Sequence, residues 1–472
     1  MGHQGDGVDR RSHGSGHTCY RMGGCGSVGR KPVGHALLLG NFGRMMAVRL
    51  ELPFDARRPA KSTVGGGHPC RRCQPASWLW RALTSIVRER LPAPALFRGQ
   101  DRRKLALNAD RPRCRSRTGS PSGYAMNRTI SVIFRVIPLI MGAVCLSFGL
   151  YILAGPDDAN RFVAGHVNVG LTAICYALFT TAATIIRQLI NRYGRVWAII
   201  LPLSGYVAAA AAILWGIVLA NRDNTAENLT AGFVVIGIGF VAACVSTVAA
   251  ASTKFTLIQS AQLLEPQGGP PEGAHSRAVG AVLLAVPVVS AVVGFSLAIG
   301  LLVRGDTPGF VAGHVLIGLS AICTALIALV ASIVRQVRNE FSDGERSAWP
   351  WLVAAAGTIN VLLGLFVLFI SHEPYRLAPG CVLIGLGLIC FSILSKVLLL
   401  ALVWRRTFAL ANRIPLMPIG TALTCLFFAA FLFEAAGTDP AFFVPAHVLV
   451  GLGAVCFTLF SIVSILEAGT SE

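Results

Sequence analysis

Apolar and polar residues alternate in long blocks along residues 126–472. Ten apolar segments, each about 20 residues long, are centred near residues 144, 174, 208, 242, 291, 322, 360, 390, 426 and 455. Mostly short polar stretches separate them. An apolar run of this length can cross a bilayer as one helix, so the pattern predicts an all-α polytopic membrane protein with about ten transmembrane helices.

A second pattern repeats inside these segments. The string FVAGHVNVGLTAIC at residues 162–175 is nearly identical to FVAGHVLIGLSAIC at 310–323 and to FVPAHVLVGLGAVC at 443–456. Alignment on the central glycine yields five copies, because two further segments carry the glycine alone. The five glycines are Gly170, Gly237, Gly318, Gly385 and Gly451. Each copy follows one segment without the motif, which predicts five tandem two-helix repeats that all enter the membrane in the same direction.

The histidine of the motif is present in three copies, as His166, His314 and His447, whereas Phe233 and Cys381 replace it in the other two. The glycine four residues later shares the helical face of the histidine. Since small residues allow helices to approach closely in lipid, this face is predicted to be a packing seam.

Three roles for the imidazoles stay open at this point. Each ring can form a hydrogen bond to the next helix and fix its register. The three rings can instead gain charge as the pH outside falls, and so act in pH sensing or proton movement. A metal cluster of His166, His314, Cys381 and His447 is the third alternative, and it would need helices from separate repeats to converge.

Few other polar residues lie inside the apolar segments. Lys396 is either a deep charge with a functional role or a side chain that snorkels towards the membrane edge, and the second is favoured. Glu434 either accepts a proton or remains a shallow, solvated carboxylate. Asn168 and Asn360 are predicted to form hydrogen bonds between helices. The cysteines at the repeated position are interpreted as small buried residues, without a disulfide framework or a metal site.

Composition supports the membrane assignment, and the distribution of charge along the chain limits what the net charge indicates. The chain has 472 residues, of which 54% are hydrophobic and 13% charged, with a mean hydropathy of +0.63. Its net charge of +19 is concentrated in residues 1–125, which hold 23 of the 41 Lys and Arg and 7 of the 22 Asp and Glu. This segment is predicted to be a basic, disordered N-terminal extension, with Met126 as the true start and 126–472 as the membrane domain. We therefore expect no nucleic-acid partner.

The remaining positive charges predict an orientation. Fourteen of the 18 Lys and Arg in residues 126–472 lie in loops on the side of Met126. By the positive-inside rule both termini are then cytoplasmic, in a multi-pass protein of the bacterial inner membrane whose main partner is the lipid bilayer.

Several strings in this part of the chain, such as RVIPLIMG, SKVLLLALVWRRT and VLVGLGAVCFTLFSIVSILEAG, resemble the YhiM family of bacterial inner-membrane proteins. The resemblance covers nearly all of residues 126–472 and implies a polytopic inner-membrane protein with a link to acid or membrane stress. It carries over no substrate and no catalytic residue. Phe233 stands where the family pattern suggests histidine, which weakens any scheme in which every copy titrates.

Two classes of function agree with these features. The first is a transporter or channel-like protein for an unknown solute or ion, and the second is a non-transporting membrane sensor or stress-response protein with pH-sensitive histidines. We expect no enzymatic activity, since phosphate-binding, metalloprotease and nucleophile motifs are missing from the sequence. No cofactor site is indicated, and the sequence does not predict an oligomeric state.

Overall fold

A computed structural model describes residues 128–156, 158–189, 193–223, 225–255, 274–371, 373, 375–403, 414 and 416–470. They belong to one compact unit, which is described here by itself. The predicted N-terminal extension 1–125, the predicted start at Met126 and most of the connection between Lys254 and Arg277 lie outside these residues.

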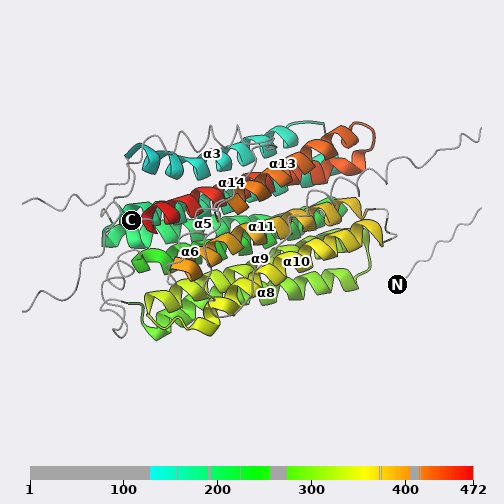
Figure 1. The fold of residues 1–472 in the computed structure, drawn as a ribbon. Helices are drawn as coiled ribbons and strands as arrows, with labels where there is room; N and C mark the ends of the chain where they lie inside the picture. Colours follow the sequence, from blue (N-terminus) through cyan, green and yellow to red (C-terminus); the bar gives the residue numbers. More distant parts are fainter. Residues whose placement is uncertain are drawn as a thin grey trace, which may run out of the picture. The chain divides into compact units, whose positions relative to one another are not determined.

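Ten long helices and two short 3₁₀ helices make up the secondary structure of the described residues (Figure 1). In chain order they are α3 (Arg128–Leu153), α4 (Ala159–Leu189), α5 (Arg195–Ala220), α6 (Ala226–Ala251), η1 (Ser252–Lys254), α8 (Arg277–Val303), α9 (Thr307–Val337), α10 (Asp343–Phe369), α11 (Leu377–Val403), α13 (Leu416–Ala436), η2 (Pro440–Phe442) and α14 (Phe443–Thr470). All ten long helices are apolar and long enough to cross a membrane. The prediction of an all-α polytopic protein with about ten transmembrane helices is confirmed.

Burial divides these helices into two groups that alternate along the chain. In α4, α6, α9, α11 and α14, between 72% and 83% of the apolar segment is buried; we name these the inner helices. In α3, α5, α8, α10 and α13, the outer helices, the buried share is only 28–39%. The outer helices expose large aliphatic residues such as Leu214, Val292 and Leu362. In a chain this apolar such a surface fits the hydrocarbon of a bilayer.

The inner helices form a closed ring. Each contacts the next one along the chain, and α14 packs against α4, so that the last inner helix meets the first. An intervening outer helix returns the chain each time, so all five inner helices run in the same direction. If neighbouring axes are about 8–10 Å apart, each lies roughly 7–8 Å from a common centre. Five helices arranged in this way enclose a central space that side chains must fill.

Each outer helix packs against two inner helices. One is the inner helix that follows it in the chain, and the other is the inner helix that precedes it, with α3 contacting α14 to complete the set. These contacts place ten helices in two concentric layers. The derivation of the five helix pairs from repeated sequence units stays a prediction.

The five motif glycines lie at the contacts between inner helices. A Cβ atom on Gly237 would lie 2.7 Å from Leu316 and Leu319 of α9, and one on Gly385 would lie 2.7 Å from Leu449 and Leu452 of α14. The other three, Gly170, Gly318 and Gly451, face α6, α11 and α4 in the same way. Every glycine therefore receives side chains of the next inner helix in the ring.

A second set of glycines, which the sequence analysis did not single out, brings the outer helix against its inner partner in four of the five pairs; in the fifth, Ala446 of α14 holds the equivalent position. A Cβ on Gly216 of α5 would lie 2.6 Å from the carbonyl oxygen of Gly232 in α6, and one on Gly364 of α10 would lie 2.7 Å from that of Gly380 in α11. A Cβ at either position would press on backbone atoms, which cannot move aside as a flexible side chain can. The signal was present in the sequence as a glycine one residue before the histidine position.

The two ends of the bundle differ in character. The inner helices begin at the end that carries His166, His314 and His447, which we name the histidine end, and they finish at the basic end. There Arg338 forms two hydrogen bonds to the carboxylate of Glu340, at 2.7 and 3.0 Å, and a third to the carbonyl of His275 at 2.8 Å. The guanidinium of Arg338 lowers the pKa of Glu340. The basic end thus has ion pairs of its own, outside the ring.

We predict that Gly232→Ala destabilises the protein, because the new methyl group would press on the backbone of Gly216 and Ala220. The expected loss is about 1–3 kcal/mol in the free energy of unfolding, measured by titration with SDS in mixed micelles. The matched control is Gly300→Ala in α8, where a Cβ has nothing within 4 Å. It should leave stability unchanged or raise it by up to about 1 kcal/mol. Equal effects of the two changes would contradict the close helix contact.

Candidate functional site

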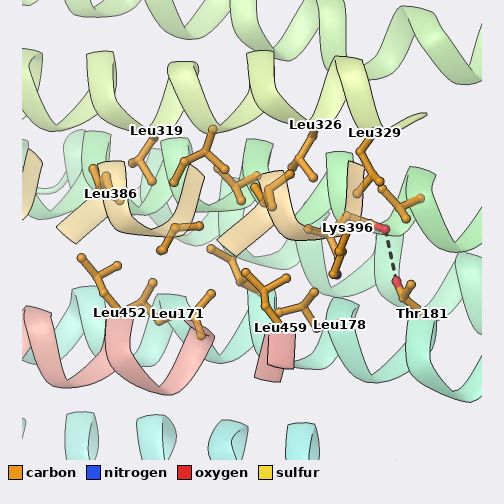
Figure 2. Close-up of a pocket in the computed structure, with 18 residues that line it drawn as sticks. Leu171, Leu178, Thr181, Leu319, Leu326, Leu329, Leu386, Lys396, Leu452 and Leu459 are labelled. Atoms are coloured by element: carbon orange, nitrogen blue, oxygen red, sulfur yellow. Dashed lines mark hydrogen bonds between the residues drawn. The ribbon is translucent and has the colours of Figure 1, made fainter. Parts of the chain in front are cut away.

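A narrow cavity runs along the centre of the inner ring, and all five inner helices line it (Figure 2). On each helix the lining residues recur at alternating spacings of three and four, as in Leu386, Ile389, Ile393 and Lys396 of α11. This spacing keeps one narrow stripe of a helix facing its neighbours, as in a coiled coil. The other lining residues are Leu171, Ile174, Leu178, Thr181, Val241, Val245, Val248, Leu319, Ile322, Leu326, Leu329, Leu452, Val455 and Leu459.

The cavity is almost closed by its aliphatic wall. It leaves about 20 Å³ for the centre of a water-sized sphere, and a single water needs about 10–15 Å³ measured in this way. There is room for one water molecule, and none for an organic solute, in this conformation. A passage along the axis would require the apolar residues to move apart.

Two polar residues, Lys396 and Thr181, interrupt the apolar lining. Figure 2 shows both near Leu329 and away from Leu171, Leu386 and Leu452, which places them towards the basic end of the cavity. The hydroxyl of Thr181 donates to the carbonyls of Ala177 at 3.1 Å and Val245 at 3.4 Å. Its hydrogen is thus engaged with backbone carbonyls.

Lys396 lies on the ring axis and only 3% of its surface is exposed. The predicted snorkelling of this side chain to the membrane edge is therefore wrong. Residues 386, 389, 393 and 396 share one stripe, so the packing that points Leu386 at the axis points Lys396 there as well. In the part of the chain that the structure describes, no hydrogen bond or ion pair of its ammonium group is found.

Polar residues continue the lining stripes beyond Lys396. Gln188, Ser252 and Gln336 lie seven residues after Thr181, Val245 and Leu329, and all three are buried. Gln188 Nε2 donates to the carbonyl of Ser252 at 2.6 Å, which links α4 to the end of α6. The axis is therefore apolar towards the histidine end and polar towards the basic end. The sequence analysis missed this gradient, because the seven-residue spacing from the apolar stripe gains meaning only once the five helices are known to share one axis.

The three histidines lie outside the cavity, and His166 and His447 lie at seams between neighbouring helix pairs. In each, Nδ1 donates to the carbonyl four residues earlier in its own helix: His166 to Phe162, His314 to Phe310 and His447 to Phe443, at 2.7–2.8 Å. One of the three alternatives was a hydrogen bond from the ring to the next helix. Nδ1 does not form it, because the carbonyl one turn earlier in the same helix accepts its hydrogen bond. The bond leaves Nε2 of each ring free for another partner.

Aromatic rings and arginines surround the histidine seams. Phe148 stacks on His447, with ring centroids 5.4 Å apart, and Phe433 meets the same ring edge-on at 4.6 Å. Trp215 of α5 stacks on His166 at 5.9 Å. Arg161 lies 5.5 Å above the ring of Phe443 and near His447, while Arg222 is the charged group near His166. In the described residues no group of three or more His, Cys, Asp or Glu side chains is arranged for a metal ion.

Glu434 and the two asparagines take different positions. Glu434 is exposed near the end of α13, and no ion pair joins it to a histidine of the described chain; Phe433 contacts His447 instead. Asn168 Nδ2 donates to the carbonyl of His447 in α14 at 3.3 Å, across the contact that closes the ring. Asn360 Nδ2 donates to the carbonyl of Gly318 in α9 at 3.3 Å.

The cysteines at the repeated position occupy the interior between the helix layers. Cys175, Cys323, Cys390 and Cys456 are each no more than 1% exposed, as are Cys145, Cys244 and Cys425, and all of them are free thiols. Small apolar packing is the usual role of such residues.

A two-layered bundle of apolar helices with a lipid-compatible surface defines a multi-pass α-helical membrane protein. The chain belongs to the family described as "Protein of unknown function (DUF2776)", whose model matches residues 126–471. It is 52% identical over 349 residues to "Inner membrane protein YhiM" of Escherichia coli (strain K12), an alignment that covers 74% of this chain and 100% of that protein. No solved structure matches it. The predicted family is confirmed, and the chain is a multi-pass protein of the bacterial inner membrane.

We predict that Asn168→Ala and Asn360→Ala each lower the free energy of unfolding by about 0.5–2 kcal/mol, because each removes a hydrogen bond between helices in lipid. The control is Asn221→Ala. Asn221 is exposed at the end of α5 and bonds only to Ile217 of its own helix. SDS titration in mixed micelles measures all three variants, and a loss in Asn221→Ala as large as in the other two would argue against the special role of the buried pair.

Proposed function

We propose that this protein is a transporter or channel-like protein whose pathway follows the axis of the inner ring. The observation that carries the proposal is the cavity to which all five inner helices contribute and on whose wall Lys396 lies. A charged side chain inside a membrane protein is costly, and such residues commonly mark pathways for ions or solutes. We propose no enzymatic activity.

The aliphatic lining would act as the gate. A narrow apolar constriction excludes water and blocks ions without a physical plug, and it conducts once it widens and becomes wet. The constriction would extend from Leu171 to Leu326, where aliphatic residues of all five helices meet. The conformation described above is then the closed one.

Orientation in this proposal follows the positive charges. Arg187, Arg195, Lys254, Arg277 and Arg335 lie at the basic end, so the positive-inside rule directs that end to the cytoplasm. The histidine end would face the exterior, where His166, His314 and His447 would meet external acid first. The proposed function therefore includes a response to acid or membrane stress through these residues.

We predict that Ile322→Ser raises ionic conductance several-fold, since a hydroxyl on the cavity wall helps water to enter the constriction. The full-length protein is incorporated into planar bilayers in potassium chloride, and conductance per protein is compared with the unmodified chain. Val292→Ser is the matched control, because Val292 is 59% exposed on the outer face of α8. Unchanged conductance in Ile322→Ser, with the fold retained, would count against an axial gate.

We predict that a variant with His166, His314 and His447 all replaced by Ala loses the rise of flux on acidification. Each imidazole is neutral above its pKa and charged below it, so three charges appear together at the seams when the outside becomes acid. Full-length protein in liposomes with a trapped pH dye reports proton flux for outside pH 5 to 8. Flux that rises equally in the variant would remove the histidines from the gating step.

A sensor without transport is the second candidate, and two observations favour it. The cavity has room for one water molecule only, and the histidines lie on helix seams rather than on the cavity wall. Protonation would then shift the packing between helix pairs without opening a path. A pH-dependent conformation, seen as a change in Trp215 fluorescence with no flux of protons or other ions, would decide for the sensor.

A further inference from the structure

Lys396 combines deep burial with the lack of a counter-charge in the described part of the chain. Its side chain lies among Ile393, Leu329 and Leu459 on the wall of the axial cavity. About 28 Å of helix separate it from the start of α11 at the histidine end, at 1.5 Å per residue. The acidic residues of that end, such as Asp306 and Glu373, are therefore out of its reach.

The described carboxylates at the basic end are already engaged with arginines. Glu340 pairs with Arg338 at 2.7 Å, Glu345 with Arg335 at 3.3 Å and Asp343 with Arg346 at 2.9 Å. These residues belong to the turn between α9 and α10 and to the start of α10, outside the cavity lining. Among the described residues, none that lines the cavity is acidic.

An ammonium group that is removed from water needs a partner that restores the lost interactions. The cavity whose wall includes Lys396 has about 20 Å³ of free space in all, which is room for one molecule or ion of about the size of water. The other lining residues are aliphatic except Thr181, and they give no charge to balance the ammonium group. A small anion would supply the missing negative charge.

We propose that the cavity is a binding site for one small monovalent anion, held by the ammonium group of Lys396 inside the inner ring. The anion is the size of chloride, because larger anions, small carboxylates such as formate included, do not fit the free space. The inference rests on the proposed function in that both use the axial cavity, and it makes the path selective for anions.

Anion binding is tested first without any flux. The full-length protein in detergent is titrated with sodium chloride, sodium nitrate or sodium formate against sodium gluconate at constant ionic strength, and the midpoint of thermal unfolding is recorded. A ligand that binds only the folded state raises this midpoint. We expect a rise of roughly 2 °C with chloride, which grows with the logarithm of the chloride concentration once this exceeds Kd, and no rise with nitrate, formate or gluconate. An equal effect of formate would contradict a site of this size.

Three variants assign the effect to Lys396. Lys396→Met replaces the charge with an apolar side chain of similar length, and it should fold because the loss of a buried charge is often stabilising. It should lose the anion dependence, whereas Lys396→Arg should keep it. Lys254→Met is the matched control, since Lys254 is exposed in the short helix η1 that follows α6. An unmodified chain without anion dependence, or an equal dependence in Lys396→Met, would overturn the proposal and leave Lys396 as a neutral amine.

Flux separates this inference from the proposed function. Reversal potentials in planar bilayers under a potassium chloride gradient give the selectivity of the unmodified chain and of Lys396→Met. Anion selectivity that is lost in Lys396→Met supports both proposals. Anion binding without any flux supports the site and rejects the pathway. Flux with no anion preference and no anion binding rejects the site and retains the pathway.

Discussion

Close contact between the inner helices, made possible by glycine, is the constraint on which the whole structure depends. In lipid, helices gain little from the hydrophobic effect, and they associate through dispersion forces and hydrogen bonds that fall off steeply with distance. The five motif glycines each admit side chains of the next inner helix. Because Gly451 faces α4, these contacts close a ring and do not continue as an open stack. A closed ring leaves no inner helix with an unpaired packing face.

The axial cavity follows from that ring. Four or fewer helices can bring their side chains together at the centre, whereas five hold their axes roughly 7–8 Å from it. Leu, Ile and Val fill nearly all of this space, and about 20 Å³ remains. The outer helices cover the ring and present aliphatic side chains to the lipid. They also reach the inner helices through backbone contacts at Gly216 and Gly364. The architecture thus explains why the large exposed residues lie on the outer helices.

Sequence reasoning predicted the fold class and the ten helices, since long apolar segments leave few alternatives. The predicted position of Lys396 was wrong because it used only the distance of the residue from the end of α11. That distance is the same for a lysine that faces the ring axis and for one that faces the lipid, and the two differ only in their angle around the helix. The polar continuation through Gln188, Ser252 and Gln336 was also missed, because each residue is unremarkable alone and gains meaning only when five helices share one centre. Trp215 beside His166 and Phe148 beside His447 come from other helix pairs, so no local sequence pattern predicts these contacts.

The separation of the histidines from the axis bears on how any activity is controlled. His447 packs among Phe148, Phe433 and Phe443 at a seam between helix pairs, whereas Lys396 lies on the axis near the opposite end. A charge that appears on His447 cannot act on Lys396 directly over such a length of helix, because Coulomb interactions weaken with distance and are screened. It can act through packing. The same α4–α14 contact that Asn168 bridges to the carbonyl of His447 carries Leu171 and Leu452 into the cavity wall. Movement at the seam would therefore shift the apolar wall of the cavity, which makes the ring itself the coupling between the two ends.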